Sequence, residues 1–499
     1  MTDLIDKHRK WIPYLFITFT IFIAYLNSFR GIFQFDDYNV IVNNNVVHSW
    51  HAWFDDLGHG IRPILKFTYT LNWTSGMGFS GFHLLNLIVH TINALMIYSL
   101  SLRFMKRASG RRVAIIISIV WAIHPVQSEA VTYISGRSSS LMAMFYLGSI
   151  LAYVYGIEKQ RRIYLYLVSP VFFLMAVLTK ETALIFPLAL LLWELTQQRR
   201  INLITVIKRQ IIHWGLLCIM IIAIIIHPNY GGLLEYSLGI RGVGKNLMSQ
   251  INGVSYLITR VFLIHRLNID PDLPVISEWS IVLVMECIFL SILLIIGALC
   301  LRKRPLLGFG ILWFFLHLIP TNSIVPRLDV ANERQLYLPV LGLILSFVSI
   351  VPVFKETPRP LRGTKDNENP PISPFFKGGL NSPPLEKGGK GGFERGFSDE
   401  KGVFKKACIV SLILLLIIFT VRRNHVYRSE VTLWEDTAYK SPQKARVFNN
   451  LGYAYTMAGR YKDAEDAYLK AISLKPDYKL PQNNLKELLK KIDHKQNLY

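Results

Sequence analysis

The chain has 499 residues, of which 52% are hydrophobic and 18% charged, and its mean hydropathy is +0.33. A soluble protein of this length would carry charge throughout a few domains, whereas here the charges cluster between apolar runs, which excludes that class. The formal net charge of +22 does not indicate nucleic-acid binding, because Lys and Arg lie in short loops between these runs, as the positive-inside rule of membrane proteins describes.

The first apolar run, residues 11–29, follows several basic residues and lacks a small-residue cleavage site, so it is predicted to be a signal anchor. Later runs approach the ~20 residues that cross a bilayer as a helix. Since backbone polar groups cannot stay unpaired in lipid, the sequence predicts an all-α, polytopic bundle of about eleven transmembrane helices. The predicted spans are 11–29, 82–102, 113–123, 139–157, 163–179, 182–196, 211–227, 279–301, 305–320, 336–354 and 407–421.

A further apolar stretch, residues 247–267, is interrupted by Arg260, His265 and Arg266, and is predicted to form a helix that lies at the membrane interface. With the N-terminus in the cytoplasm, this choice places every strongly basic short loop on the cytoplasmic side. The predicted organisation is a transmembrane domain over 1–354, a linker, a last span over 407–421 and a module over 422–499.

The linker, residues 355–406, is rich in Pro, Gly and Lys, and a unit like SPFFKGG and SPPLEKGG recurs in it. Such a composition cannot bury enough apolar surface to offset the entropy of the chain, so a disordered cytoplasmic segment is predicted. An inserted low-complexity sequence without a role is favoured over a binding function.

The C-terminal module carries the tetratricopeptide pattern over residues 445–478, where small residues let two antiparallel helices approach. The residues at the pattern's spacing are Phe448, Leu451, Gly452, Tyr455, Ala464, Tyr468, Ala471 and Pro476. Arrays normally need about three repeats for stability, so this small module is predicted to lean on the membrane domain. The parity of the spans places it outside, in a periplasm or lumen.

The unusual polar residues of the outside loops gather on one face of the membrane, and ionisable groups at that depth tend to be functional. They are Asp36 and Asp37, then His124, Glu129 and Arg137, then Lys180 and Glu181, then Arg327, Arg334 and Tyr337. A carboxylate can take a proton from an acceptor hydroxyl, while Arg and Lys can stabilise charge on a phosphate leaving group. These residues therefore indicate displacement at a lipid phosphate.

Several motifs resemble the membrane glycosyltransferases of the GT-C fold, and more closely the transmembrane-and-tetratricopeptide protein O-mannosyltransferases and their bacterial relatives. They are FDD at 35–37, RPILKFTYTLNW at 62–73, GFHLLNLIVHTINALM at 81–96, HPVQSEAVTYISGRSSSL at 124–141, LTKETA at 178–183, NERQLYLP at 332–339 and the tail SEVTLWEDTAYKSP. The resemblance covers nearly the whole chain except the linker. Animal relatives usually have an acidic residue after Gly-Arg, whereas Ser138 follows Arg137 here.

The resemblance implies an inverting transfer of a sugar, a mannose-like hexose or a similar one, from a polyprenyl-phosphate donor to a hydroxyl on the outer face. It maps the catalytic acidic pair onto Asp36 and Asp37. The residues expected to bind the donor phosphate or the substrate are Arg137, Lys180, Glu181, Arg334, His124, Glu129 and Tyr337. No cofactor is required by these residues, although a carboxylate pair could bind a divalent metal.

Other interpretations stay open for some of these residues. The acidic pair could be a helix cap, Lys180 and Glu181 could form an ion pair that pins a turn, and Arg62 could position the first outside loop. The alternative function is a non-catalytic membrane scaffold whose repeat module docks a partner. A transporter is disfavoured, because the polar residues gather at one end of the bundle only. The expected location is a bacterial inner membrane. The expected partners are membrane lipid and a protein, either as acceptor or bound by the repeat module; the acceptor could equally be a lipid or a polysaccharide.

Overall fold

The computed structural model describes residues 2–105, 110–197, 202–351 and 391–496, and within these ranges it contains helices and no strand. The first ten α-helices are α1 (Thr2–Tyr25), α2 (Trp50–Asp56), α3 (Pro63–Thr74), α4 (Gly78–Phe104), α5 (Gly110–Ala122), α6 (Ser128–Val131), α7 (Arg137–Glu158), α8 (Ser169–Thr179), α9 (Phe186–Gln197) and α10 (Leu203–Ile226). The others are α11 (Pro228–Ile240), α12 (Val243–Phe262), α13 (Ile281–Lys303), α14 (Pro305–Leu318), α15 (Pro339–Ile350), α16 (Gly391–Val426), α17 (Glu430–Lys440), α18 (Ala445–Met457), α19 (Tyr461–Leu474) and α20 (Lys479–Gln496). The predicted all-α membrane fold is confirmed.

Six helical segments of the described chain are long and apolar enough to cross a membrane, and a bent pair makes up to seven. The six are Trp11–Arg30, Gly78–Phe104, Ile134–Glu158, Leu203–Ile226, Ile281–Lys303 and Val403–Val426. The pair joins α5 to Pro125–Val131 at a bend of 50°. The predicted number of eleven is not confirmed, since the 14 residues of α14 and the 12 of α15 would rise only about 20 Å, against a hydrocarbon core of about 30 Å.

The core of the bundle surrounds α7. In the membrane-length segment that contains α7, 72% of the residues of the apolar window are buried, whereas only 11% are buried in α10. Helices α4 and α8 pack directly against it, and Tyr146 of α7 meets Trp313 of α14 edge to face. Helix α5 packs against α4 and α15, and α15 packs against α14. Gly310 of α14 and Gly342 of α15 face each other, and a Cβ on either residue would collide with the backbone oxygen of the other. These glycines let the two short helices approach closely, which keeps both in the interior of the bundle.

The interfacial helix predicted over 247–267 is α12, which is not among the helices apolar enough to span. One face of α12 is buried, including Asn246, Gly253 and Leu257, whereas Phe262 is 64% exposed. This amphipathic distribution agrees with the prediction that α12 does not cross.

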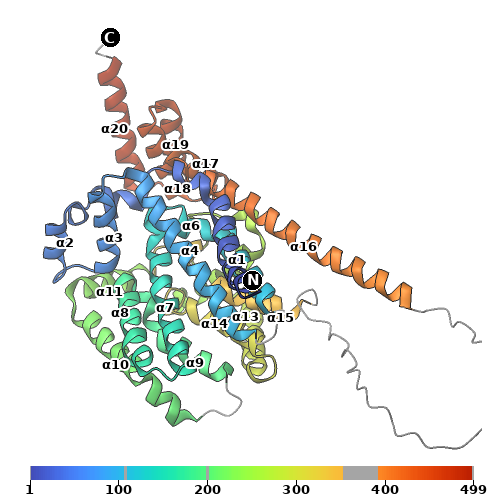
Figure 1. The fold of residues 1–499 in the computed structure, drawn as a ribbon. Helices are drawn as coiled ribbons and strands as arrows, with labels where there is room; N and C mark the ends of the chain where they lie inside the picture. The colour runs from blue at the N-terminus through green and yellow to red at the C-terminus, as the bar shows by residue number, and fades with distance from the viewer. Residues whose placement is uncertain (1, 106–109, 198–201, 352–390, 497–499) are drawn as a thin grey trace, which may run out of the picture.

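The linker boundary predicted at residue 406 is wrong, because α16 begins at Gly391 and runs without a break to Val426. Residues 352–390, which make up most of the predicted linker, lie outside the described residues. Helix α16 contains the last membrane-length segment, Val403–Val426, and leads directly into the C-terminal helices α17 to α20 (Figure 1).

The C-terminal helices pack onto one end of the bundle, as predicted for a module too small to stand alone (Figure 1). Asp270, in the loop after α12, accepts hydrogen bonds from Lys444 at 2.5 Å and from Arg446 Nε at 3.0 Å. At a second contact, Arg423 of α16 lies 3.3 Å from Glu333 and 3.2 Å from Asp436 of α17. These partly buried, multiply hydrogen-bonded ion pairs fix the module against the loops at that end.

Candidate functional site

Asp37 closes a tight turn in the loop between η1 (Leu26–Arg30) and η2 (Tyr38–Val42). Its carboxylate accepts hydrogen bonds from the backbone N–H of Gln34 at 3.0 Å and of Ser135 at 2.8 Å. The side chain is fully buried, and burial raises the pKa of Asp37 to about 7, although the two N–H groups oppose this shift. Both carboxylate oxygens are thus engaged with backbone, and Asp37 ties the first loop to the start of α7.

Asp36 points toward the opening of the site instead. Its backbone N–H donates to the hydroxyl of Tyr133 at 2.8 Å, and its side chain is 36% exposed. One oxygen of its carboxylate lies 3.6 Å from Nη1 of Arg334. Of the two acids, Asp36 is therefore the one that a ligand can reach.

Arg334 connects the acidic loop to the interior of the bundle. It lies in the short helix η9 (Glu333–Leu336), which begins with a capping box formed by Asn332 and Gln335. Its Nε is 3.7 Å from Glu129 Oε1, and its backbone N–H donates to Glu129 Oε2 at 2.9 Å. Burial alone would lower the pKa of Arg334, but the charges of Glu129 and Asp36 outweigh burial and raise it. Glu129, which is almost fully buried, thereby holds this guanidinium in place.

Lys180 and Arg327 add further positive charge beside Arg334. The ammonium group of Lys180 donates to Ser139 Oγ at 2.8 Å, and burial followed by the charges of Arg334, Arg62 and Arg327 holds its pKa well below the usual value. Burial and the same cationic neighbours lower the pKa of Arg327 to about 10. Among the described residues the Arg327 guanidinium forms no hydrogen bond or ion pair. Such crowding of cations is relieved by a bound anion.

Arg62 is paired with Glu181, not left free. The guanidinium donates to both oxygens of Glu181, at 2.9 and 2.8 Å, and Tyr230 donates to the same carboxylate at 2.6 Å. Burial would raise the pKa of Glu181, but the charge of Arg62 outweighs it and the pKa is lowered. The alternative of an ion pair between Lys180 and Glu181 is therefore wrong, and Glu181 joins the turn after α8 to the first outside loop through Arg62.

A narrow cavity of about 30 Å³ forms the inner part of the site. Its lining includes Ser139, Lys180, Arg334 and the ring of Tyr337. The cavity is large enough for a few water molecules, each of which needs about 10–15 Å³ by this measure. Within the described part of the chain, its polar wall includes two basic side chains, those of Lys180 and Arg334, and no acidic one, so the cavity suits an anionic group.

The structure places the other predicted residues away from this cavity or in structural roles. Arg137 is fully buried and donates to Asn86 Oδ1 at 2.6 Å and to the backbone oxygens of Thr68 and Phe82 at 3.1 and 3.0 Å. Its donors are consumed by these groups, so the expected phosphate contact of Arg137 is corrected to a packing role.

His124 and Tyr337 are likewise held by the bundle. His124 Nε2 lies 3.0 Å from the backbone oxygen of Val261, and its Nδ1 accepts from the N–H of Val126 at 3.2 Å. The Tyr337 hydroxyl bonds to His90 at 2.8 Å and to Asn93 at 2.9 Å. His124 is buried, holds two backbone groups and does not line this cavity, so its expected substrate contact stays a prediction, while Tyr337 is part of the cavity wall.

From the sequence alone, Arg62 was assigned no chemistry, and Arg327 was counted among the polar residues of the outside loops but not among the expected phosphate contacts. The signal available for them was only their charge and their loop position; the pairing with Glu181 and the proximity to Lys180 depend on the fold. Within the described residues, no group of three or more His, Cys, Asp or Glu side chains converges as a metal site would require.

Fold and site together define a polytopic helical membrane protein whose buried acids and cations meet at one end of the bundle, beside a C-terminal repeat module. Residues 445–478 match the tetratricopeptide repeat family. Over 497 aligned residues the chain is 26% identical to "Protein O-mannosyl-transferase F38B6.6" of Caenorhabditis elegans, with 91% of this chain and 62% of the relative covered. It is 24% identical to human "Protein O-mannosyl-transferase TMTC4", with 65% and 53% covered.

The similarity to other relatives is confined to shorter regions. Human "Protein O-mannosyl-transferase TMTC3" is 29% identical over 145 residues, which cover 26% of this chain and 15% of that protein. The chain spans 62% and 53% of the length of the first two relatives. No solved structure matches the chain.

Proposed function

We propose that this protein is a membrane glycosyltransferase that transfers a mannose-like hexose from a polyprenyl-phosphate donor to a hydroxyl acceptor. The observation that carries the proposal is the pairing of the reachable carboxylate of Asp36 with Arg334, 3.6 Å away, beside Lys180 and Arg327. A base next to a cluster of cations is what a sugar transfer with a phosphate leaving group requires. The names of the relatives point to the same reaction class.

In the proposed mechanism, Asp36 is the general base. The acceptor oxygen attacks the anomeric carbon from the side opposite to the phosphate, the bond from this carbon to the phosphate oxygen breaks, and Asp36 takes the acceptor proton. The configuration of the sugar is inverted in this single displacement. Asp37 is a positioning residue, because its oxygens are occupied by the N–H groups of Gln34 and Ser135.

The leaving phosphate would be held by Lys180, Arg327 and Arg334, and Glu129 would orient the last of these. Lys180 and Arg327 have lowered pKa values because they are buried and crowded by like charges. A phosphate placed between them would raise both pKa values back toward their usual range and would gain charge-assisted hydrogen bonds. Glu181 takes part indirectly, since it fixes Arg62 at the edge of the same cluster.

We further propose that the site and the C-terminal module face the periplasm of a bacterial inner membrane, with 1–354 and the last span forming the catalytic membrane domain. The basic loops that support this orientation lie at the opposite ends of the helices, for example after Phe104 of α4 and Lys303 of α13. The module would then be on the side where a protein acceptor is available, next to Asp36.

The test is sugar transfer by the purified protein in liposomes, with a panel of polyprenyl-phosphate sugars. Asp36→Asn should lower the turnover by roughly 10²- to 10⁴-fold, which is the usual contribution of a general base. Asp55→Asn is the matched control, because Asp55 is 66% exposed and pairs only with His51 in α2. If no donor turns over with the wild type, or if Asp36→Asn is as active as Asp55→Asn, catalysis is abandoned in favour of a scaffold.

A further inference from the structure

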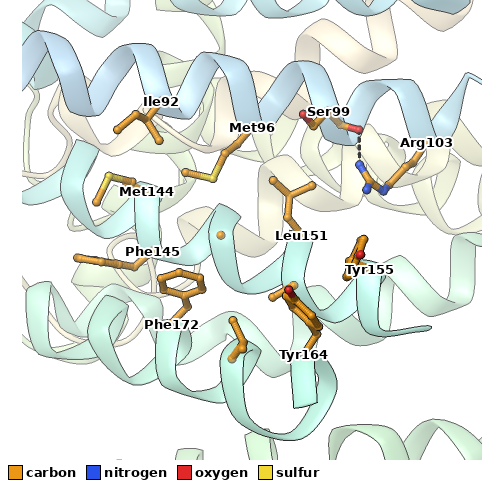
Figure 2. A pocket seen from close by; sticks show the side chains of 13 residues that line it. Ile92, Met96, Ser99, Arg103, Met144, Phe145, Leu151, Tyr155, Tyr164 and Phe172 are labelled. Carbon is orange, nitrogen blue, oxygen red and sulfur yellow. Dashed lines mark hydrogen bonds between the residues drawn. The ribbon is translucent and has the colours of Figure 1, made fainter. Parts of the chain in front are cut away.

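A second cavity, of about 520 Å³, opens along the side of the bundle between α4, α7 and the segment formed by η6 (Tyr164–Val168) and α8. Figure 2 shows its walls, which are apolar over most of their length. They include Ile92 and Met96 of α4, Met144 and Leu151 of α7, and Phe172 of α8. Since α4 and α7 both belong to the membrane-length segments, this groove lies at the depth of the bilayer.

Small residues on α7 leave room for the groove. Gly148 and Ala152 stand one helical turn apart in its lining, so the floor carries almost no side-chain volume. A Cβ on Gly148 would meet only the ring of Phe172, at 3.5 Å, which is an ordinary contact. A side chain at 148 can therefore start into the groove without a backbone clash, and a larger one would occupy the space beside Phe172.

One end of the groove is polar and basic. Arg103 donates from Nη1 to the backbone oxygen of Ser99 at 2.8 Å (Figure 2). Its Nε lies 3.3 Å from Glu158. Tyr155 and Tyr164 pack edge to face at 4.7 Å at the same end. Exposed Lys159, Arg161 and Arg162 follow directly after α7. Tyrosines and cations together are typical of the level of the lipid headgroups.

The length of the groove matches one leaflet. Ile92 and Arg103 are eleven positions apart on α4, which corresponds to about 16 Å at about 1.5 Å per residue. Half of a hydrocarbon core of about 30 Å is nearly the same distance. With Arg103 at the headgroups, Ile92 therefore lies near the middle of the bilayer.

We propose that this groove binds one acyl chain of an anionic phospholipid, whose phosphate is held by Arg103 and the hydroxyl groups of Tyr155 and Tyr164. The excess of basic over acidic residues at this end selects an anionic headgroup over a zwitterionic one. The site is distinct from the phosphate site proposed above, because Ser139, the partner of Lys180, lies at the other end of α7. The lipid would fill the gap between α4 and α8 and support α7, the most buried of the membrane-length helices.

The experiment uses the purified full-length protein, delipidated in detergent and titrated with phosphatidylglycerol or with phosphatidylcholine of the same chain length. Bound lipid is counted by native mass spectrometry. Wild type should retain phosphatidylglycerol several-fold more tightly, and Arg103→Gln should reduce this preference by about fivefold, which is the effect of one cation near an anionic surface. Gly148→Leu should reduce the binding of both lipids. Arg112→Gln, at an exposed basic residue of α5, is the matched control.

Circular dichroism melting of each variant separates a loss of lipid from a loss of fold. Equal retention of the two lipids by wild type, or unchanged binding by both folded variants at residues 103 and 148, overturns the proposal. Displacement of phosphatidylglycerol by polyprenyl phosphate, with loss of sugar transfer in Gly148→Leu, would assign the groove to the donor chain and would also refute it. The lipid-binding readout does not depend on activity, so it stands if the proposed transfer fails.

Discussion

Substitution of Glu430 by alanine is expected to lower the turnover of the proposed sugar transfer while the protein stays folded. Glu430 is the first residue of α17, and one oxygen of its carboxylate accepts the backbone N–H of Phe35 at 3.0 Å. Phe35 directly precedes Asp36 and has a positive φ of 48°, a conformation that residues other than glycine rarely adopt. Its ring packs against Trp434 of the same helix at 5.2 Å. The C-terminal segment therefore holds the loop that presents Asp36.

The magnitude follows from two opposing terms. A hydrogen bond to a charged group contributes about 1.5–3 kcal/mol, and the partial exposure of Glu430 favours the lower end. The strained backbone of Phe35 costs of the order of 1–3 kcal/mol, so the loop has a reason to relax once its partner is removed. A loss of about 1.4 kcal/mol lowers the equilibrium constant between the competent and the relaxed loop tenfold. We therefore expect kcat to fall by up to about tenfold, with KM for the lipid donor unchanged, because the cations that would hold the phosphate are untouched.

The assay is steady-state sugar transfer in liposomes, with kcat and KM determined separately. Glu430→Gln keeps an acceptor oxygen and should recover most of the activity. Glu435→Ala is the matched control, since Glu435 lies on the same helix but bonds to Tyr455 and Arg460 within the module. A tenfold loss in Glu435→Ala as well, or an unchanged kcat in folded Glu430→Ala, would show that the module does not position the loop.

Three further predictions concern the buried charges. The pKa of Asp37 is raised from 3.8 to about 7, so between these pH values the folded protein keeps a proton that the unfolded chain loses. The free energy of unfolding should therefore fall by up to about 4 kcal/mol as the pH rises from about 4 to about 7. The difference in Tm between wild type and Asp37→Asn, followed across this pH range, measures this loss. Arg137→Leu should lower Tm strongly, because it leaves Oδ1 of the buried Asn86 without its donor and removes the side-chain hydrogen bonds to the carbonyl groups of Thr68 and Phe82. A folded variant with only a raised KM would restore a phosphate role. Arg446→Ala should expose α18 to limited proteolysis, because it removes a contact to Asp270; an unchanged cleavage rate would mean that Lys444 suffices.

The sequence was sufficient to predict those features of the fold that depend on local composition or on a periodic pattern of residues. Hydropathy and the placement of Lys and Arg identified a polytopic helical membrane protein, and spaced small and aromatic residues identified the repeat at 445–478. The sequence did not determine the number of spans, because composition alone does not distinguish short apolar helices such as α14 and α15 from helices that cross the membrane. Their packing through Gly310 and Gly342 explains how they stay buried at this length.

For the candidate site, the sequence determined which charged residues share one end of the bundle, because alternation of the chain across a membrane fixes the side of each loop. Only the tertiary structure decided which partners each of them has. Asp36 and Asp37 are neighbours with equal chemistry, and they differ because Ser135, far along the chain, donates to one of them only. Arg137 and Arg334 are both arginines of outside loops, yet Arg137 is consumed by buried carbonyl groups while Arg334 faces Asp36. A hydrogen bond depends on positions within tenths of an ångström between distant segments, and this information exists only once the chain is packed.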